Sequence, residues 1–544
     1  MNTRQLQTDK NQKLYHALLG ILLVCALAMM MLLSYWACKY SYYGAVDGRT
    51  RGVLVGDKTW AHIAVFLAAS LCTMGIDKVL MKKDKSQQEK ICLCTLIVTS
   101  VIAFILGVFY VCKNPYYPVG DQINTTAFAA YCRDGNFSML SIGGYVGMYQ
   151  QQKGLAILYE ILFTLFGDFN YRPAKILHVV WWILTILAGY GFLKLNTDRT
   201  VFRMLYCVMM LGCFPLLFYL PYIYGDVLSI SFGIILFYGV AAYEHSGQKR
   251  YIALASFAAG LAVLARKNTW IVLVAVAVYV LLVSLRKKKV RYLMAGTAIL
   301  LTAALSVKAV DVIYEVRSGY PSGVGVPSIL WVAMGLQETE GRAGVYNRYQ
   351  QATFTDYDCQ QELAAQQGKE YIRERLEEFS QDPGMAFDFF KNKLEGQWIE
   401  PMYAALESTE SFEEGAELSP VLESLYYGEL GRTIWKLTNY YQSILYLAGL
   451  MALVMLGILW WKKKEVPISL WLPWIAVFGG FLFSILWEAK SRYVFPYCVF
   501  MILYAPEGLY QTGLLLCKLP KLRKFKKSGH TQDKGEEASL RETA

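Results

Sequence analysis

One acidic residue, Asp121, could do chemistry at the edge of a membrane. It follows Gly120 directly, after an apolar segment that ends near Val111 and a turn that contains Pro115 and Pro118. At the boundary between lipid and water, a carboxylate can stay ionised while a lipid-borne substrate reaches it from the side. We therefore interpret Asp121 as a candidate general base. An alternative stays open, because Gly-Asp before a helical stretch is also an ordinary helix N-terminus.

Three further stretches place charge beside apolar segments. The turn PYIYGD ends in Asp226, LARKN contains Arg266 and Lys267, and WEAKSRYVFP contains Glu488, Lys490, Arg492 and Tyr493. Charge at the ends of membrane helices is unusual enough to suggest binding. Two structural alternatives remain open. Glu488 and Arg492 lie four residues apart and could form only a surface ion pair, and Arg266 could anchor its helix end by snorkelling.

Composition indicates the kind of protein that carries these residues. Of the 544 residues, 55% are hydrophobic and 17% are charged. Several apolar runs exceed the roughly 18 residues that a membrane-spanning helix needs. The first, Leu14 to Cys38, follows a basic leader and lacks a small-residue cleavage site, so it is predicted to be a retained helix. The sequence therefore predicts an all-α polytopic membrane protein.

The charge distribution sets the predicted orientation. Residues 311–436 carry 22 acidic and 10 basic side chains, a net charge of −12, whereas the rest of the chain carries +23. The basic excess gathers in short loops, which the positive-inside rule places in the cytoplasm: Lys82, Lys83, Lys85, Lys90, Arg286 to Lys289, Arg291, Lys462 to Lys464, and the tail from Lys518. Such a tail more commonly fixes orientation and contacts anionic lipid than it binds nucleic acid.

This rule gives about twelve crossings with both termini inside. The exception is the apolar stretch 154–167, which at 14 residues is short for a span and is predicted to lie along the outer surface. The predicted crossings are 15–38, 59–80, 91–112, 176–193, 204–222, 227–243, 251–265, 269–285, 292–310, 437–460, 468–486 and 496–516. Asp121 is then external.

The same threading divides the chain into four parts. Residues 1–310 form an N-terminal transmembrane module whose external loop, 113–175, holds Asp121. Residues 311–436 form a mainly helical external subdomain, with helices predicted in 359–381 and in 383–398, where Asp382 is a plausible N-cap. Residues 437–516 are C-terminal transmembrane helices, and 517–544 are a basic cytoplasmic tail.

Cysteine, histidine and tryptophan suggest no further site. The 12 cysteines lie mostly in apolar runs without a Cys-x-x-Cys pair, and the five histidines are scattered, so no protein-built zinc centre is predicted. Five tryptophans are interpreted mostly as interface-belt residues: Trp398, Trp435, Trp460, Trp471 and Trp487.

The order of these motifs resembles the C-type (GT-C) integral membrane glycosyltransferases. It is closest to the bacterial branch related to protein O-mannosyltransferases and to the aminoarabinose transferases that modify lipid A. The resemblance spans roughly residues 90 to 510. The motifs that carry it are YPVGDQ at 117–122, LFG before RPAKILH, YGD at 224–226, LARKN, WVAMGLQETEGRAGVYN at 331–347, FFKNKLEGQWIEP at 389–401 and EAKSRYVFP.

The resemblance implies a GT-C-like fold with external juxtamembrane helices, and an inverting transferase on the outer face of a bacterial plasma membrane. The expected donor is a polyprenyl-phosphate-linked sugar, and the acceptor is an envelope glycan, glycolipid or protein; contact with membrane lipid is expected and nucleic acid is not. Asp121 would be the base, and Arg266, Lys267 and Arg492 would stabilise the leaving phosphate. The other expected substrate-binding residues are Asp226, Glu488 and Tyr493.

The sequence departs from this family in three places. Gln122 follows Asp121 where relatives often have a second acid, YQQQKGL from Tyr149 lacks the usual proline, and two segments precede the loop instead of one. No cofactor is therefore predicted as required, although a divalent cation stays open. Two other functions remain alternatives: a transporter or flippase of lipid-linked sugars, and a membrane scaffold. A transporter would be expected to show repeats or broken helices with polar groups near mid-membrane.

Overall fold

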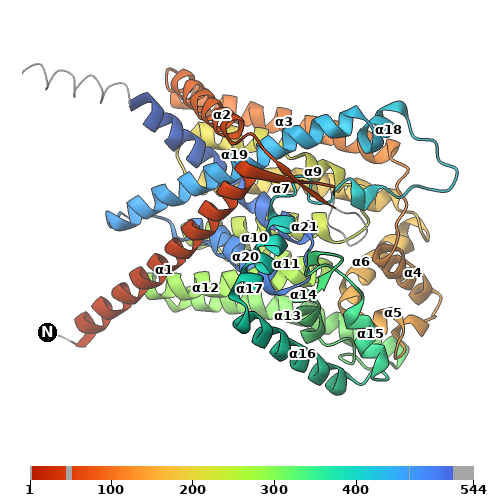
Figure 1. Ribbon diagram of the computed structural model, residues 1–544. Helices are drawn as coiled ribbons and strands as arrows, with labels where there is room; N and C mark the ends of the chain where they lie inside the picture. Colours follow the sequence, from red (N-terminus) through yellow and green to blue (C-terminus); the bar gives the residue numbers. More distant parts are fainter. Residues whose placement is uncertain (1–2, 45–51, 465, 519–544) are drawn as a thin grey trace, which may run out of the picture.

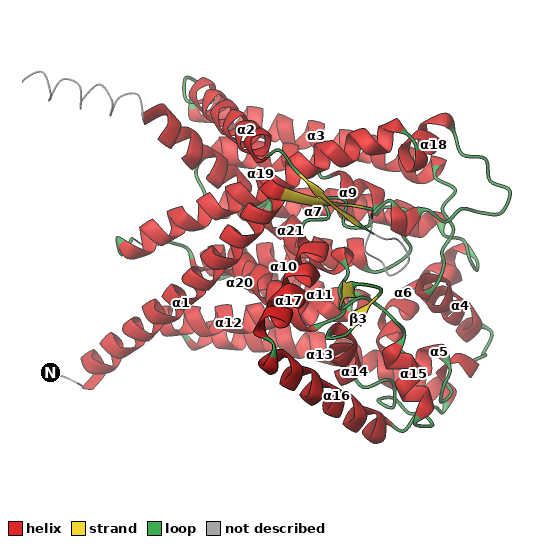
Figure 2. Cartoon of the chain, in the orientation of Figure 1, coloured by secondary structure: helices red, strands yellow, loops and turns green. Residues whose placement is uncertain are grey.

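The computed structural model describes residues 3–44, 52–464 and 466–518. The predicted basic tail, 517–544, lies almost entirely outside these residues. The described chain is overwhelmingly helical, with two short antiparallel pairs of strands (Figure 2). Strand β1 (Tyr40–Tyr43) pairs with β2 (Val53–Gly56), and β3 (Glu338–Thr339) pairs with β4 (Arg342–Ala343).

Nine helices within the described residues are long and apolar enough to cross a membrane. These confirm an all-α, multi-pass membrane architecture. They are α1 (Thr3–Lys39), α2 (Thr59–Leu80), α3 (Lys85–Lys113), α7 (Arg172–Asn196), α10 (Asp226–Ser246), α12 (Trp270–Lys287, after the 3₁₀ turn η3, Lys267–Thr269), α13 (Val290–Ser318), α19 (Glu429–Trp461) and α20 (Leu472–Leu486, after η5, Ile468–Trp471).

Three predicted crossings form shorter or interrupted helices. The 204–222 stretch divides into α8 (Thr200–Leu211) and α9 (Phe214–Phe218), because Pro215 fits a first helical turn and not a helix interior. The 251–265 stretch is α11 (Lys249–Ala265), and 496–516 divides into α21 (Ser491–Met501) and a helix at 505–518. The count of twelve spans therefore stays a prediction.

Helix α10 lies at the centre of the bundle. It packs against α7 on one side and α11 on the other, and 83% of its most apolar stretch is buried. A helix that is apolar all round is stable only when other helices surround it. Trp398 and Trp471, expected in an interface belt, are also buried, with 0% and 2% exposure. The Trp398 indole instead donates a hydrogen bond to Ser484 Oγ at 3.0 Å.

Several short helices gather at the end of the bundle opposite the N-terminus (Figure 1). One group lies between α3 and α7: α4 (Asp121–Arg133), η1 (Ser138–Leu140), α5 (Tyr145–Met148), η2 (Gln150–Gln152) and α6 (Lys153–Phe166). The other follows α13: α14 (Ile329–Gly335), α15 (Tyr349–Asp356), α16 (Gln361–Gln381), α17 (Pro383–Trp398), η4 (Glu407–Thr409) and α18 (Pro420–Tyr427). The two groups touch directly, since Tyr116 forms a β-bridge with Phe412.

This arrangement makes the predicted sidedness testable. Ile142, beside α5, is 76% exposed, whereas Lys462 follows the far end of α19. In a cysteine-free background, we expect Ile142→Cys to react with an impermeant maleimide on intact cells, and Lys462→Cys to react only after permeabilisation. The opposite labelling pattern would invert the predicted orientation.

Candidate functional site

Two of the predicted charged residues form a buried pair. Asp226 begins α10, Arg266 follows α11, and Arg266 Nη2 lies 3.5 Å from Asp226 Oδ1. Gly225 allows this approach, because a Cβ atom there would lie 2.0 Å from the Ala265 carbonyl oxygen. Burial lowers the pKa of Arg266, but the Asp226 carboxylate raises it overall. The contact therefore links the start of α10 to the end of α11.

Arg492, on α21, lies near the Asp226–Arg266 pair, but tyrosine rings surround it instead of a carboxylate. Its guanidinium lies over the rings of Tyr222, Tyr224 and Tyr493, with centroid distances of 5.2, 5.4 and 5.6 Å. Among the described residues it joins no ion pair, and its Nε is buried without a hydrogen-bond partner. Tyrosine rings stabilise a cation by about 0.5–2 kcal/mol but do not neutralise it. Arg492 therefore retains a charge that an anion could use.

Glu488 contacts other residues, so the structure does not show the Glu488–Arg492 ion pair that was the alternative to substrate binding. Glu488 Oε1 lies 3.1 Å from Lys490 Nζ, and Oε2 accepts a hydrogen bond from the Tyr493 hydroxyl at 3.4 Å. Burial lowers the pKa of Lys490, but the Glu488 carboxylate raises it overall, which keeps the ammonium charged. A simple structural partner for Arg492 is thus missing from the described chain.

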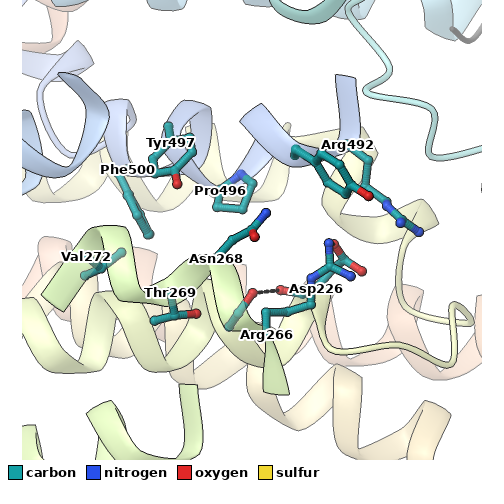
Figure 3. Close-up of a pocket in the computed structure, with 11 residues that line it drawn as sticks. Asp226, Arg266, Asn268, Thr269, Val272, Arg492, Pro496, Tyr497 and Phe500 are labelled. Atoms are coloured by element: carbon teal, nitrogen blue, oxygen red, sulfur yellow. Dashed lines mark hydrogen bonds and ion pairs between the residues drawn. The ribbon is translucent and has the colours of Figure 1, made fainter. Parts of the chain in front are cut away.

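A small pocket joins these groups (Figure 3). Arg492 reaches it from the wall opposite Asp226 and Arg266. The cavity holds about 20 Å³, room for one water molecule, so a phosphate or a sugar ring would require side chains to move. Its lining residues are Asp226, Ser229, Arg266, Asn268, Thr269, Val272, Arg492, Tyr493, Pro496, Tyr497 and Phe500.

Asp121 begins α4, as the sequence predicts, and lies outside this pocket. Gly120 is the N-cap and has a φ of +59°, a conformation that favours glycine. The Asp121 carboxylate accepts a hydrogen bond from the Tyr145 hydroxyl at 2.8 Å instead of capping the helix backbone. The carboxylate also contributes to raising the pKa of Arg266 and of Lys490. Asp121 and the cations therefore share one electrostatic environment.

Lys267 lies apart from the other predicted residues. Its side chain is exposed and its Nζ is 3.4 Å from Ser328 Oγ, and it does not line the pocket. The assignment of the seven residues to a site stays a prediction, but the structure brings Asp226, Arg266, Arg492 and Tyr493 around one pocket, with Glu488 beside them.

Sequence reasoning missed several residues near this site. Tyr145 contacts Asp121, and the Tyr224 ring lies 4.7 Å from the Arg266 guanidinium. Lys393 is buried on α17 and its Nζ donates a hydrogen bond to the Gly335 carbonyl. Tyr224 belongs to the YGD turn and was a usable signal, because tyrosines in charged turns often hydrogen-bond or stack on them. Tyr145 lies 24 residues from Asp121 and had no such signal. Nothing local distinguishes Lys393 from an exposed lysine.

Lys393 leads to a pH prediction. Burial lowers its pKa to about 7, and Glu488 opposes that change only partly. Between about pH 7 and the ordinary value of 10.5 the unfolded chain then binds more protons, so stability rises with pH in that window. We expect Lys393→Met to reduce the gain in melting temperature between pH 7 and pH 9.5, measured by thermal unfolding in detergent. Exposed Lys369→Met is the control, and an unchanged gain in Lys393→Met would contradict the assignment.

No three His, Cys, Asp or Glu side chains in the described parts of the chain come together in a way that could hold a metal ion. No protein-family model, curated protein or solved structure matches this chain. The site geometry and the order of the sequence motifs are therefore the features that point to a function.

Proposed function

We propose that this protein transfers a sugar from a polyprenyl-phosphate-linked donor to a cell-envelope acceptor on the outer face of a bacterial plasma membrane. The observation that carries the proposal is Arg492, a cation that joins no ion pair among the described residues and that faces a pocket beside Asp226 and Arg266. A second cation, Lys490, and the accessible carboxylate of Asp121 lie at the same end of the bundle. The ordered resemblance to GT-C enzymes points to the same chemistry, and to a GT-C-like fold with about twelve spans.

In the proposed reaction, Asp121 removes the proton from an acceptor hydroxyl as its oxygen attacks the anomeric carbon. The bond between that carbon and the phosphate oxygen breaks, the configuration inverts, and polyprenyl phosphate leaves with the bonding electrons. Negative charge grows on the phosphate while the sugar gains positive character. A guanidinium can hold two phosphate oxygens at once, so Arg492 is suited to stabilise that charge.

Arg266 plays a different part from Arg492 in this proposal. Its guanidinium lies 3.5 Å from the Asp226 carboxylate and 4.7 Å from the Tyr224 ring centroid. Breaking such a buried pair usually costs more than the pair contributes, because one charge is left uncompensated. We therefore assign Asp226 and Arg266 mainly to positioning, and Arg492 to the substrate phosphate.

A reconstituted assay separates the transferase from the flippase. Purified protein in liposomes receives a polyprenyl-phosphate sugar labelled in the sugar, together with an envelope extract as acceptor. A transferase moves label to the extract and releases an equal amount of polyprenyl phosphate. A flippase instead carries the intact lipid-linked sugar to the other leaflet without breaking the glycosyl-phosphate bond. Translocation without release would refute the proposal.

A further inference from the structure

Five aromatic side chains form a continuous row beside the candidate site. The ring of Phe483 stacks on Trp487, which stacks on Trp331; Tyr149 follows, and then Tyr145. Successive ring centroids are 5.0, 5.9, 6.1 and 5.2 Å apart, and every ring is partly exposed. We call this set the aromatic row. Its members come from α5, α14 and α20 and from the residues that directly follow α5 and α20.

The two ends of the aromatic row lie in different environments. Phe483 belongs to α20, one of the nine candidate spans, where Leu482 and Leu486 are 47% and 51% exposed. Exposed leucines on a spanning helix indicate a face in contact with lipid. At the other end, the Tyr145 hydroxyl donates its hydrogen bond to Asp121. The row therefore connects a lipid-facing surface with the candidate base.

Two positively charged residues follow Trp487 in the sequence. Three residues after Trp487 comes Lys490, whose Nζ lies 5.3 Å from the Tyr346 ring centroid, and two residues later comes Arg492. A ligand that suits this order has a long apolar chain followed by an anionic group. An isoprenyl phosphate has that form, with flat unsaturated units that can lie against aromatic faces.

We propose that the aromatic row binds the isoprenoid units next to the phosphate of the lipid-linked donor. This inference rests on the proposed function, and adds how the donor reaches the site: sideways from the bilayer, along α20. A membrane-borne glycolipid acceptor is the competing ligand. Arg492 follows Trp487 by five residues and joins no ion pair among the described residues, so it matches an anionic head directly attached to the chain. Packing of α14 on α20 without any ligand is the structural alternative.

The test is dependence of turnover on donor chain length. The donors carry the same sugar on isoprenyl phosphates of two and of about eleven units, and kcat/KM is measured for each. Flat isoprenoid units can stack on several rings of the row, so we expect the wild type to prefer the long donor by at least tenfold. We expect Trp331→Ala/Trp487→Ala to reduce that preference to about twofold. Trp461→Ala, an 80% exposed tryptophan at the far end of α19, should leave it unchanged.

Each outcome decides the inference. A double variant that keeps the tenfold preference would show that the row is packing only, and a change that depends on the acceptor lipid and not on donor length would assign it to the acceptor. Should the double variant unfold, Trp487→Leu replaces it, because it keeps apolar volume without the ring. If the wild type turns over no donor, the proposed function fails separately; crosslinking of a diazirine-bearing prenyl phosphate then tests the row alone, and label absent from residues 483–487 would overturn it.

Discussion

Asp121→Asn is expected to lower sugar transfer by more than about a hundredfold, the usual share of general-base catalysis. Asparagine keeps the size of aspartate and can still accept the hydrogen bond that Tyr145 donates, so α4 and its surroundings should be preserved. It cannot take a proton from the acceptor. The measurement is turnover with a short-chain polyprenyl-phosphate sugar, together with thermal unfolding of the variant.

Asp134→Asn is the matched control for this variant. Asp134 is an exposed aspartate at the opposite end of α4, where it occupies the C-cap. Loss of one exposed carboxylate there should leave both turnover and melting temperature close to wild type. Near-normal turnover in Asp121→Asn would exclude a general base at this position, and an equal loss in both variants would point to charge alone.

Arg492→Lys is expected to reduce kcat/KM for the donor by about tenfold, and Arg492→Ala by about a hundredfold or more. A charge-assisted hydrogen bond contributes roughly 1.5–3 kcal/mol, and lysine keeps the charge but cannot grip two phosphate oxygens. The three tyrosines around Arg492 hold the guanidinium without a carboxylate, so the melting temperature should fall only slightly.

A charge exchange separates binding from structure at Arg492. Because Glu488 contacts Lys490 and Tyr493, the combination Glu488→Lys/Arg492→Glu should not restore activity. Exposed Arg373→Ala on α16 is the control for loss of an arginine. Recovery of turnover by the exchange would refute the assignment of Arg492 to the phosphate. It would support instead the Glu488–Arg492 ion pair that the four-residue spacing suggests.

The parts of the fold that could be predicted depend on local chemistry. The helix at 383–398 begins as expected, because the Asp382 carboxylate accepts a hydrogen bond from the Met385 amide at 2.9 Å. The apolar stretch that was too short to span is α6, within one residue of its expected bounds. Caps, lengths and apolar content are properties of neighbouring residues, so one sequence reveals them.

The parts of the fold that could not be predicted depend on which face of a helix packs against which other element. The spacing in α17 places Phe387, Phe390 and Leu394 on one face, yet Phe387 is 68% exposed. Phe389 joins Phe390 in packing against Phe379 of α16. Similarly, Trp487 resembles any tryptophan at a membrane boundary until the fold stacks it on Trp331, 156 positions earlier in the chain. Contacts across such distances are tertiary and leave no local pattern.

The candidate site follows the same division. Charged turns identified Asp226, Arg266 and Arg492, because charge beside an apolar helix is visible in the sequence. Their partners were not visible: the four-residue spacing suggested Glu488 for Arg492, whereas Glu488 pairs with Lys490. Helical spacing assumes that both residues lie on one helix, but α21 begins only at Ser491, so Glu488 precedes it.

Gly225 has a consequence for how variation in this protein should be interpreted. No side chain larger than hydrogen fits there, since a Cβ would overlap the Ala265 carbonyl oxygen at 2.0 Å, and that carbonyl immediately precedes Arg266. A mutational scan scored on activity would therefore record Gly225 as intolerant as a catalytic residue, although it offers no group to a substrate. The two positions should differ in how many substitutions they tolerate. Every substitution at Gly225 should abolish activity, including alanine, whereas the loss at Asp226 should depend on the charge and size of the new side chain.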